Sequence, residues 1–387
     1  MTAPSNHQGR ETAGLVRLVA ARGLPGAAPL DSPTGPDVAA WFVEAARVEG
    51  LTGPLFEAVR AGEVDLPGSA RDRLVDAHRK ALIWCLAVER RLLEVHGWLR
   101  EAGVPVVVVK GSAAALLDHA DPAERTFSDV DLLVPAEHID RAVSIIGGHG
   151  LVRRSPEVRP GWDRRFTKSI TLVGVEEVEP DTPPAEAVEI DVHRTLSDGV
   201  FGARIPLDHL HATTVGFELG GVEVRALGPT QRALHAAYHA VVGSQRARLS
   251  NLREIALHLT SGPSLDELVA EAGRWRGEAV LAAAVQLVRR ELTFDAPEWF
   301  AWADGLEVSA FDRRAAAFPS QGDSGLARHR LYLVGELRSP RDKAAYLWGV
   351  AFPSPELLAS EGHRRVDRYL RWVPELVRPG GRSAREG

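Results

Sequence analysis

The chain contains few residues of several informative types. Among its 387 residues there is one cysteine, Cys85, and one methionine. A single cysteine excludes a disulfide framework and a metal cluster held by thiolates. The most apolar run, Val104 to Val109, is far too short to cross a bilayer as a helix. Because the N-terminal segment also lacks the basic start and apolar run of a signal peptide, we expect a cytoplasmic protein.

Neither sign of charge is in large excess. The chain has 46 Lys and Arg against 52 Asp and Glu, a formal net charge of −6. This balance gives no general attraction for polyanions, which disfavours nucleic acid as a substrate, although a local basic strip could still hold a nucleotide. Lysine occurs only at positions 80, 110, 168 and 343, which makes the position of Lys110 informative. Walker A, Gly-x-Ser-x-Gly and Gly-x-Gly-x-x-Gly motifs do not occur.

The length and the apolar fraction of 45% predict a globular protein of two or three packed units. The fold class we expect is α/β: a small mixed sheet flanked by N-terminal helices and a C-terminal helical bundle. The expected organisation is a loosely held arm with one short helix (1–36), a helical region (37–100), an α/β core (101–227), a helical domain (228–377) and a disordered tail (378–387).

Hydrophobic spacing supports this division. Val88, Leu92, Val95 and Leu99 recur at the spacing of one helical face. After Pro105 the pattern changes to that of strands separated by short helices and loops. Strands are expected at 106–109, 128–135, 166–173, 187–193 and 222–226, helices after residue 112, at 137–147 and beyond Pro229, and a hairpin loop at 176–187.

Two carboxylates stand close together on one predicted strand. Asp129 and Asp131 are two residues apart, so both side chains point to the same face. Carboxylates at that separation repel each other unless a cation lies between them, and neither has an adjacent lysine. Hard oxygen ligands favour Mg²⁺ or Mn²⁺ over zinc. An Asp-x-Asp pair alone is weak evidence, because such pairs are common on solvated strands.

The neighbouring segments strengthen the metal hypothesis. Upstream, a buried strand leads into Lys110, Gly111 and Ser112 at the start of a helix, where backbone N–H groups and a hydroxyl can bind phosphate oxygens. Downstream, Asp191 supplies a third carboxylate on a separate strand. Three such carboxylates can hold two metal ions for in-line displacement at phosphorus.

These motifs resemble the uncharacterised bacterial nucleotidyltransferase family of the polymerase β-type superfamily. The resemblance rests on REAGVPVVVVKGSAAALL, on Arg125 ahead of SDVDLLV, and on Asp191–Val192–His193. It continues with Leu234, His235 and His239 and with Phe352–Pro353, and covers about residues 38 to 375. Arg194 stands where an aromatic residue is more usual, and sixteen residues separate Ser112 from Asp129, more than in minimal nucleotidyltransferases.

The resemblance implies a reaction and a role for each motif. A nucleoside monophosphate would move from an NTP co-substrate to a small-molecule or peptide acceptor, with release of pyrophosphate. Asp129 and Asp131 would hold both metal ions, and Asp191 would hold the catalytic one. The nucleotide would be bound by Lys110, Gly111, Ser112, Arg125 and Ser128.

Other side chains remain open to two interpretations. The basic run from Arg153 to Lys168 could guide a triphosphate or form a solvated face. His193 shares the strand face of Asp191, where a hydrogen bond to a ligand is favoured over direct metal ligation. His235 and His239 have the i, i+4 spacing of a zinc site but no evident third ligand, so buried structural histidines are favoured.

Two alternative functions also stay open. One is a nucleotide-binding regulator or adaptor that has lost catalysis. The other is a nucleotidyltransferase that modifies a peptide or RNA.

Overall fold

The structure of the chain, a computed structural model, describes residues 5–174, 187–243, 246–317 and 332–360. The predicted hairpin loop falls outside these residues except for Ala187, and so does the predicted tail at 378–387. The helices are α1 (Asn6–Ala21), α2 (Pro36–Val48), α3 (Thr52–Arg60), α4 (Gly68–Glu101), α5 (Ser112–Asp118), α6 (Ile139–Gly148), α8 (Gly199–Arg204), α9 (Leu207–Ala212), α10 (Pro229–Val241), α11 (Leu249–Ser261), α12 (Leu265–Arg274), α13 (Glu278–Glu291), α14 (Pro297–Gly305), α15 (Ala310–Ala316), α17 (Pro340–Ala351) and α18 (Pro355–Ser360).

Strands of the described residues form one mixed sheet in the order β3-β4-β5-β2-β1-β7-β6. They are β1 (Val107–Val108), β2 (Asp129–Leu133), β3 (Val152–Arg153), β4 (Ser169–Val173), β5 (Glu189–His193), β6 (Val215–Leu219) and β7 (Val222–Ala226). The β2–β5 and β1–β7 pairs are parallel, and the other pairs are antiparallel. This arrangement confirms the expected α/β class with a mixed sheet.

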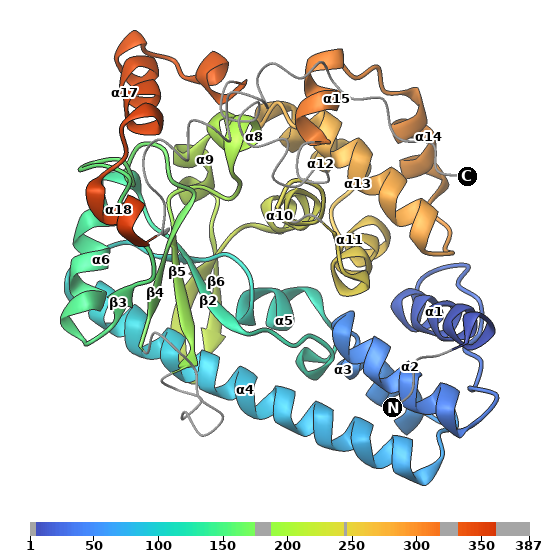
Figure 1. Ribbon diagram of the computed structural model, residues 1–387. Helices are drawn as coiled ribbons and strands as arrows, with labels where there is room; N and C mark the ends of the chain where they lie inside the picture. Colours follow the sequence, from blue (N-terminus) through green and yellow to red (C-terminus); the bar gives the residue numbers. More distant parts are fainter. Residues whose placement is uncertain (1–4, 175–186, 244–245, 318–331, 361–387) are drawn as a thin grey trace.

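Helix α4 joins the two halves of the molecule. It runs from the N-terminal helices to the sheet (Figure 1). Its first half buries Ala70 and Leu74 with the N-terminal helices, and its second half buries the predicted face of Val88, Leu92, Val95 and Leu99 against the sheet. The periodicity of the sequence is therefore confirmed, and one helix serves two cores.

The two faces of the sheet have different partners. Val130, Leu132 and Ile190 belong to the core that contains α4 and α6. Leu133, in contrast, belongs to a second core with the N-terminal helices and α10–α15. Because side chains alternate along a strand, the odd-numbered residues of β2 and β5 face away from α4. Those residues include the carboxylates singled out by the sequence.

The expectation of a loosely held arm over residues 1–36 differs from the structure. Helix α1 begins with a capping box between Ser5 and Gln8, and it buries Leu15, Val16 and Val19 in the core shared with α11 and α13. Arg253 of α11 donates hydrogen bonds to the carbonyls of Ala20 and Arg22 at the end of α1. The segment is ordered although its surroundings are rich in Pro and Gly, because packing of the apolar face of α1 against the core stabilises the helix.

Among the described residues no helix combines the length and the apolar character needed to span a membrane.

Candidate active site

The candidate site is built on the two parallel strands β2 and β5. Their register places Asp131 beside Asp191, Asp129 beside Glu189, and Leu133 beside His193. Since paired residues of neighbouring strands share a face, Asp131, Asp191 and His193 converge on the side of the sheet opposite α4. Their ligand atoms all lie within 4.8 Å of one another, so this group could hold a metal ion. Asp129 is not part of that group.

Asp131 is the most buried carboxylate of the site. Its side chain is 2% exposed, and its Oδ1 lies 3.1 Å from Lys110 Nζ and 2.6 Å from His193 Nε2. Burial by itself would raise the pKa of Asp131, but Lys110 and the hydrogen bond with His193 hold that pKa well below its usual range. Asp131 is therefore ionised and has a cation beside it. The sequence did not predict this contact, because Lys110 is not adjacent to Asp131 along the chain.

Asp129 has the opposite electrostatic character. Burial and, after it, the neighbouring charge of Asp131 raise the pKa of Asp129 to about 6, although Lys110 counteracts them. Two carboxylates share one lysine here, so the site holds more negative charge than that lysine compensates. A divalent cation would relieve this excess.

Asp191 is oriented by the adjacent strand β4. Thr171 pairs with Asp191 in the antiparallel β4–β5 ladder, and its Oγ1 donates a hydrogen bond to Asp191 Oδ1. His193 is 0% exposed, and its contact with Asp131 is the hydrogen-bonding role that the sequence favoured. The structure therefore brings together two of the three predicted metal ligands with one histidine.

A polar cleft of about 370 Å³ opens next to these side chains. Several predicted nucleotide-binding residues line it, together with both strand-β2 carboxylates: Lys110, Gly111, Arg125, Ser128, Asp129 and Asp131. Residues that the sequence did not single out complete the wall, among them His119, Arg246, Arg248, Asn251 and Glu254. His239, which the sequence favoured as a buried structural histidine, lines the cleft as well. No motif or spacing marks the other five residues.

Gly111 and Ser112, which follow β1, differ in their access to the cleft. Gly111 precedes helix α5 with a φ of 54°, a conformation that favours glycine. It lines the cleft, so its backbone is accessible to a molecule bound there. Ser112 is the first residue of α5, but it is only 2% exposed and is not among the residues that line the cleft.

Arg125 contacts two other residues that line the cleft, Gly111 and Glu254. Its Nη1 donates to the carbonyl oxygen of Gly111 at 3.2 Å, and its Nη2 lies 3.2 Å from Glu254 Oε2 on α11. Burial alone would raise the pKa of Glu254, but Arg125 holds it below the usual value. Arg125 therefore links the loop before β2 to the C-terminal helices.

Helix α4 supports the loop that leads into Asp129. Trp84 Nε1 donates to the carbonyl oxygen of Ser128 at 3.1 Å, and the amide of Phe127 donates to Cys85 Sγ at 3.4 Å. Burial raises the pKa of the Cys85 thiol. The single cysteine thus has a structural contact with the loop.

Comparisons with known proteins place the chain in a family. The family model described as "Uncharacterised nucleotidyltransferase" matches residues 37–293. The chain belongs to this nucleotidyltransferase family. Among solved structures, it is similar to an antigenic nucleotidyltransferase-like protein from Paracoccidioides brasiliensis, with 17% identity, coverage of 56% of this chain and 96% of that chain, and a TM-score of 0.33. No curated protein matches it.

Of the two α10 histidines predicted as structural residues, His235 is buried, whereas His239 is partly buried and also lines the cleft. His235 is 3% exposed and its Nδ1 lies 3.3 Å from the carbonyl oxygen of Val109. Burial holds the pKa of His235 well below its usual range and lowers that of His239 to about 4. Both are therefore neutral, and neither belongs to the group of possible metal ligands found among the described residues.

The basic run from Arg153 to Lys168 forms ion pairs within the protein. Arg153 pairs with Asp163, Arg154 with Glu189, Arg164 with Asp140 and Arg165 with Asp342, while Arg159 donates to the carbonyl oxygen of Phe352. Two of these contacts, those of Arg159 and Arg165, reach α17 and the residue that follows it. The run therefore connects the sheet region to α17.

Proposed function

We propose that the chain is a metal-dependent nucleotidyltransferase that moves a nucleoside monophosphate from an NTP to an acceptor hydroxyl or similar group, with release of pyrophosphate. The observation that supports this most directly is the β2–β5 register. It places Asp131 beside Asp191, in a chain that belongs to a nucleotidyltransferase family.

The donor set fits Mg²⁺ or Mn²⁺. Asp131, Asp191 and His193 present ligand atoms within 4.8 Å of one another, and Asp129 adds a carboxylate two residues away on the same face. Carboxylate oxygens suit Mg²⁺ and Mn²⁺, and the raised pKa of Asp129 reflects negative charge that a cation would compensate. Bound between these groups, divalent ions would neutralise charge on the transferred phosphoryl group and activate the attacking hydroxyl.

The side chains of the protein supply positioning and charge. Asp129 and Asp131 would hold the metal ions, and Asp191, oriented by Thr171, would hold the catalytic ion and orient the acceptor hydroxyl. Lys110 and the backbone of Gly111 would contact the triphosphate, because both line the cleft beside these carboxylates. Ser128 lines the same cleft, and Arg125 would fix the position of Gly111 through its carbonyl oxygen. Ser112 would act through its backbone N–H, since its side chain is buried.

Mass spectrometry of reaction mixtures tests the proposed function. The protein is incubated with each NTP in turn, Mg²⁺ or Mn²⁺, and a pooled cell extract. A product heavier than its acceptor by one nucleoside monophosphate is expected with one or more NTPs, and its loss in an Asp131→Asn variant ties the product to this site. If wild type and Asp131→Asn give the same products, transfer does not use the site.

A second candidate function, nucleotide binding without transfer, is favoured by one observation. Lys110 already supplies a positive charge to Asp131, so the site contains a cation of its own. Calorimetry separates the two functions. A binder without catalysis takes up NTP equally well with Mg²⁺ and with EDTA and forms no product.

A further inference from the structure

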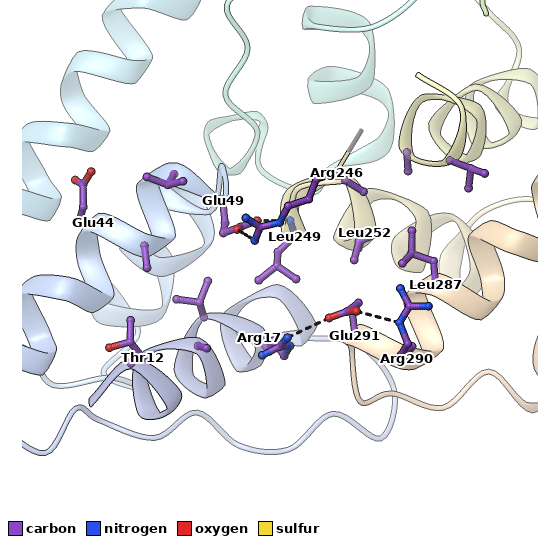
Figure 2. Close-up of a pocket in the computed structure, with 18 of the residues that line it drawn as sticks. Thr12, Arg17, Glu44, Glu49, Arg246, Leu249, Leu252, Leu287, Arg290 and Glu291 are labelled. Carbon is purple, nitrogen blue, oxygen red and sulfur yellow. Dashed lines mark hydrogen bonds and ion pairs between the residues drawn. The ribbon is translucent and has the colours of Figure 1, made fainter. Parts of the chain in front are cut away.

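A second and larger cavity lies between the N-terminal and C-terminal helices. Its volume is about 830 Å³, and residues of α1, α2, α10, α11, α13 and α15 line it (Figure 2). Small-molecule sites in proteins have volumes of about 300–1,000 Å³ and mostly apolar walls. The cavity is separate from the cleft of about 370 Å³ at the carboxylates, although Arg246 lines both.

The walls of the cavity are mainly apolar. Val16 of α1, Trp41 and Val48 of α2, Leu252 of α11 and Leu287 of α13 all face it. Val48 is 50% exposed, so part of the apolar surface is open to solvent. Covering such surface with an apolar molecule is favourable because it removes that surface from water.

Each charged side chain that lines the cavity has a partner of opposite charge, and Glu44 pairs with Arg47 outside it. Arg246 pairs with Glu49, and the amide of Leu249 donates to the other Glu49 oxygen at 2.9 Å. Arg17 and Arg290 each lie 3.1 Å from Glu291, on the opposite side of the cavity (Figure 2). An ionic ligand would have to compete with these pairs, whereas an uncharged ligand leaves them intact.

We propose that this cavity binds a small, largely apolar, uncharged molecule. The proposal stands on the volume, the apolar walls and the pairing of the charges. It is independent of nucleotidyl transfer, because binding is measured without NTP.

The test uses N-phenyl-1-naphthylamine, an uncharged apolar probe that becomes fluorescent in apolar surroundings. Saturable binding to the wild-type protein is expected. Ala283→Leu on α13 and Ala45→Leu on α2 extend side chains into the cavity from different walls and should each weaken binding at least tenfold. Ala301→Leu on α14 is the matched control, since Ala301 is exposed and outside the cavity, and it should bind as wild type does.

If one leucine variant does not fold, the other leucine variant decides the question.

Three results would overturn the proposal. One is the absence of saturable probe binding to wild type. Another is wild-type affinity in both Ala283→Leu and Ala45→Leu. The third comes from sedimentation: if these two variants turn a dimer into a monomer while Ala301→Leu does not, the cavity is an interface between copies of the chain.

Discussion

Lys110 Nζ lies 3.1 Å from Asp131 Oδ1, so the residue that ends the buried 106–109 segment neutralises the most buried carboxylate of the site. The contact is sheltered, because the side chains are 19% and 2% exposed. Burial would lower the pKa of Lys110, but Asp131 and Asp129 raise it, so the lysine stays charged. The same cation is available to a triphosphate in the adjoining cleft.

Replacing Lys110 should therefore destabilise the metal-free protein. Breaking a buried ion pair costs about 3–5 kcal/mol, and because Lys110 is partly exposed we expect about 2–4 kcal/mol for Lys110→Met in EDTA. Urea unfolding measures the difference. Lys80→Met is the control, since Lys80 pairs with Asp76 at an exposed site of α4 and should change stability by about 0.5 kcal/mol or less. Equal effects of the two substitutions would contradict the structural role of Lys110.

Asp129→Asn and Asp131→Asn should lower turnover by orders of magnitude while the protein stays folded. The amide preserves shape but removes the negative charge that metal ligation needs. The two variants should differ in stability. Asp129→Asn should be neutral or stabilising in EDTA, because its raised pKa shows that the fold disfavours the ionised form. Asp131→Asn should be destabilising, because it leaves Lys110 and His193 without their anionic partner. Near wild-type turnover of either variant with Mg²⁺ would rule out the metal assignment.

Divalent metal should raise the melting temperature of the wild-type protein, and metal with NTP should raise it further. A ligand that binds only the native state stabilises it by mass action, about 2.7 kcal/mol at a hundredfold excess over its Kd. Differential scanning fluorimetry with Mg²⁺, Mn²⁺ and each NTP measures these shifts. Asp129→Asn should lose most of the metal shift. Identical melting curves under all conditions would argue against both candidate functions.

The sequence predicts the parts of the site that depend on local periodicity. Alternation along β2 places Asp129 and Asp131 on one face, and this prediction holds because the period of a strand is fixed. The proximity of Asp131 and Asp191 depends on strand register, which no local pattern encodes. The Lys110–Asp131 contact likewise arises only when β1 pairs with β2. Residue spacing therefore predicts which side chains share a strand face, but it does not predict contacts between residues on different strands.

The packing of helix α1 could not be predicted from the sequence either. Its surroundings are rich in Pro and Gly, which suggested a loose arm, yet Ser5 and Gln8 form a capping box at its start. The S-x-x-Q pattern was a readable signal. The partners of α1 were not readable, because α11 and α13 lie more than two hundred residues away in the sequence. The cavity that these helices enclose could not be predicted for the same reason.

Arg125 and Glu254 should contribute to stability as a pair, with a pH dependence that identifies the charge involved. Their side chains are 15% and 17% exposed, so Arg125→Met leaves a mostly buried carboxylate without its partner, at an expected cost of about 2–4 kcal/mol at pH 7.5. The double variant Arg125→Met/Glu254→Gln should recover part of this loss. Arg90→Met, which breaks an exposed pair with Glu94, should change stability by about 0.5 kcal/mol or less.

The pH dependence of this pair follows from Glu254. In the wild type, Arg125 holds the pKa of Glu254 below its usual value, so the pair's stabilisation is complete above the unfolded-state pKa and is lost only as the pH falls through the lower folded-state pKa. In Arg125→Met that cation is gone, burial dominates, and Glu254 binds a proton at a higher pH than in the unfolded chain. The penalty of Arg125→Met should therefore be largest at pH 7.5 and should shrink as the pH falls towards 5. Urea unfolding of both proteins across this range measures it. A penalty independent of pH would show that Arg125 acts through its hydrogen bond to Gly111 and not through the charge of Glu254.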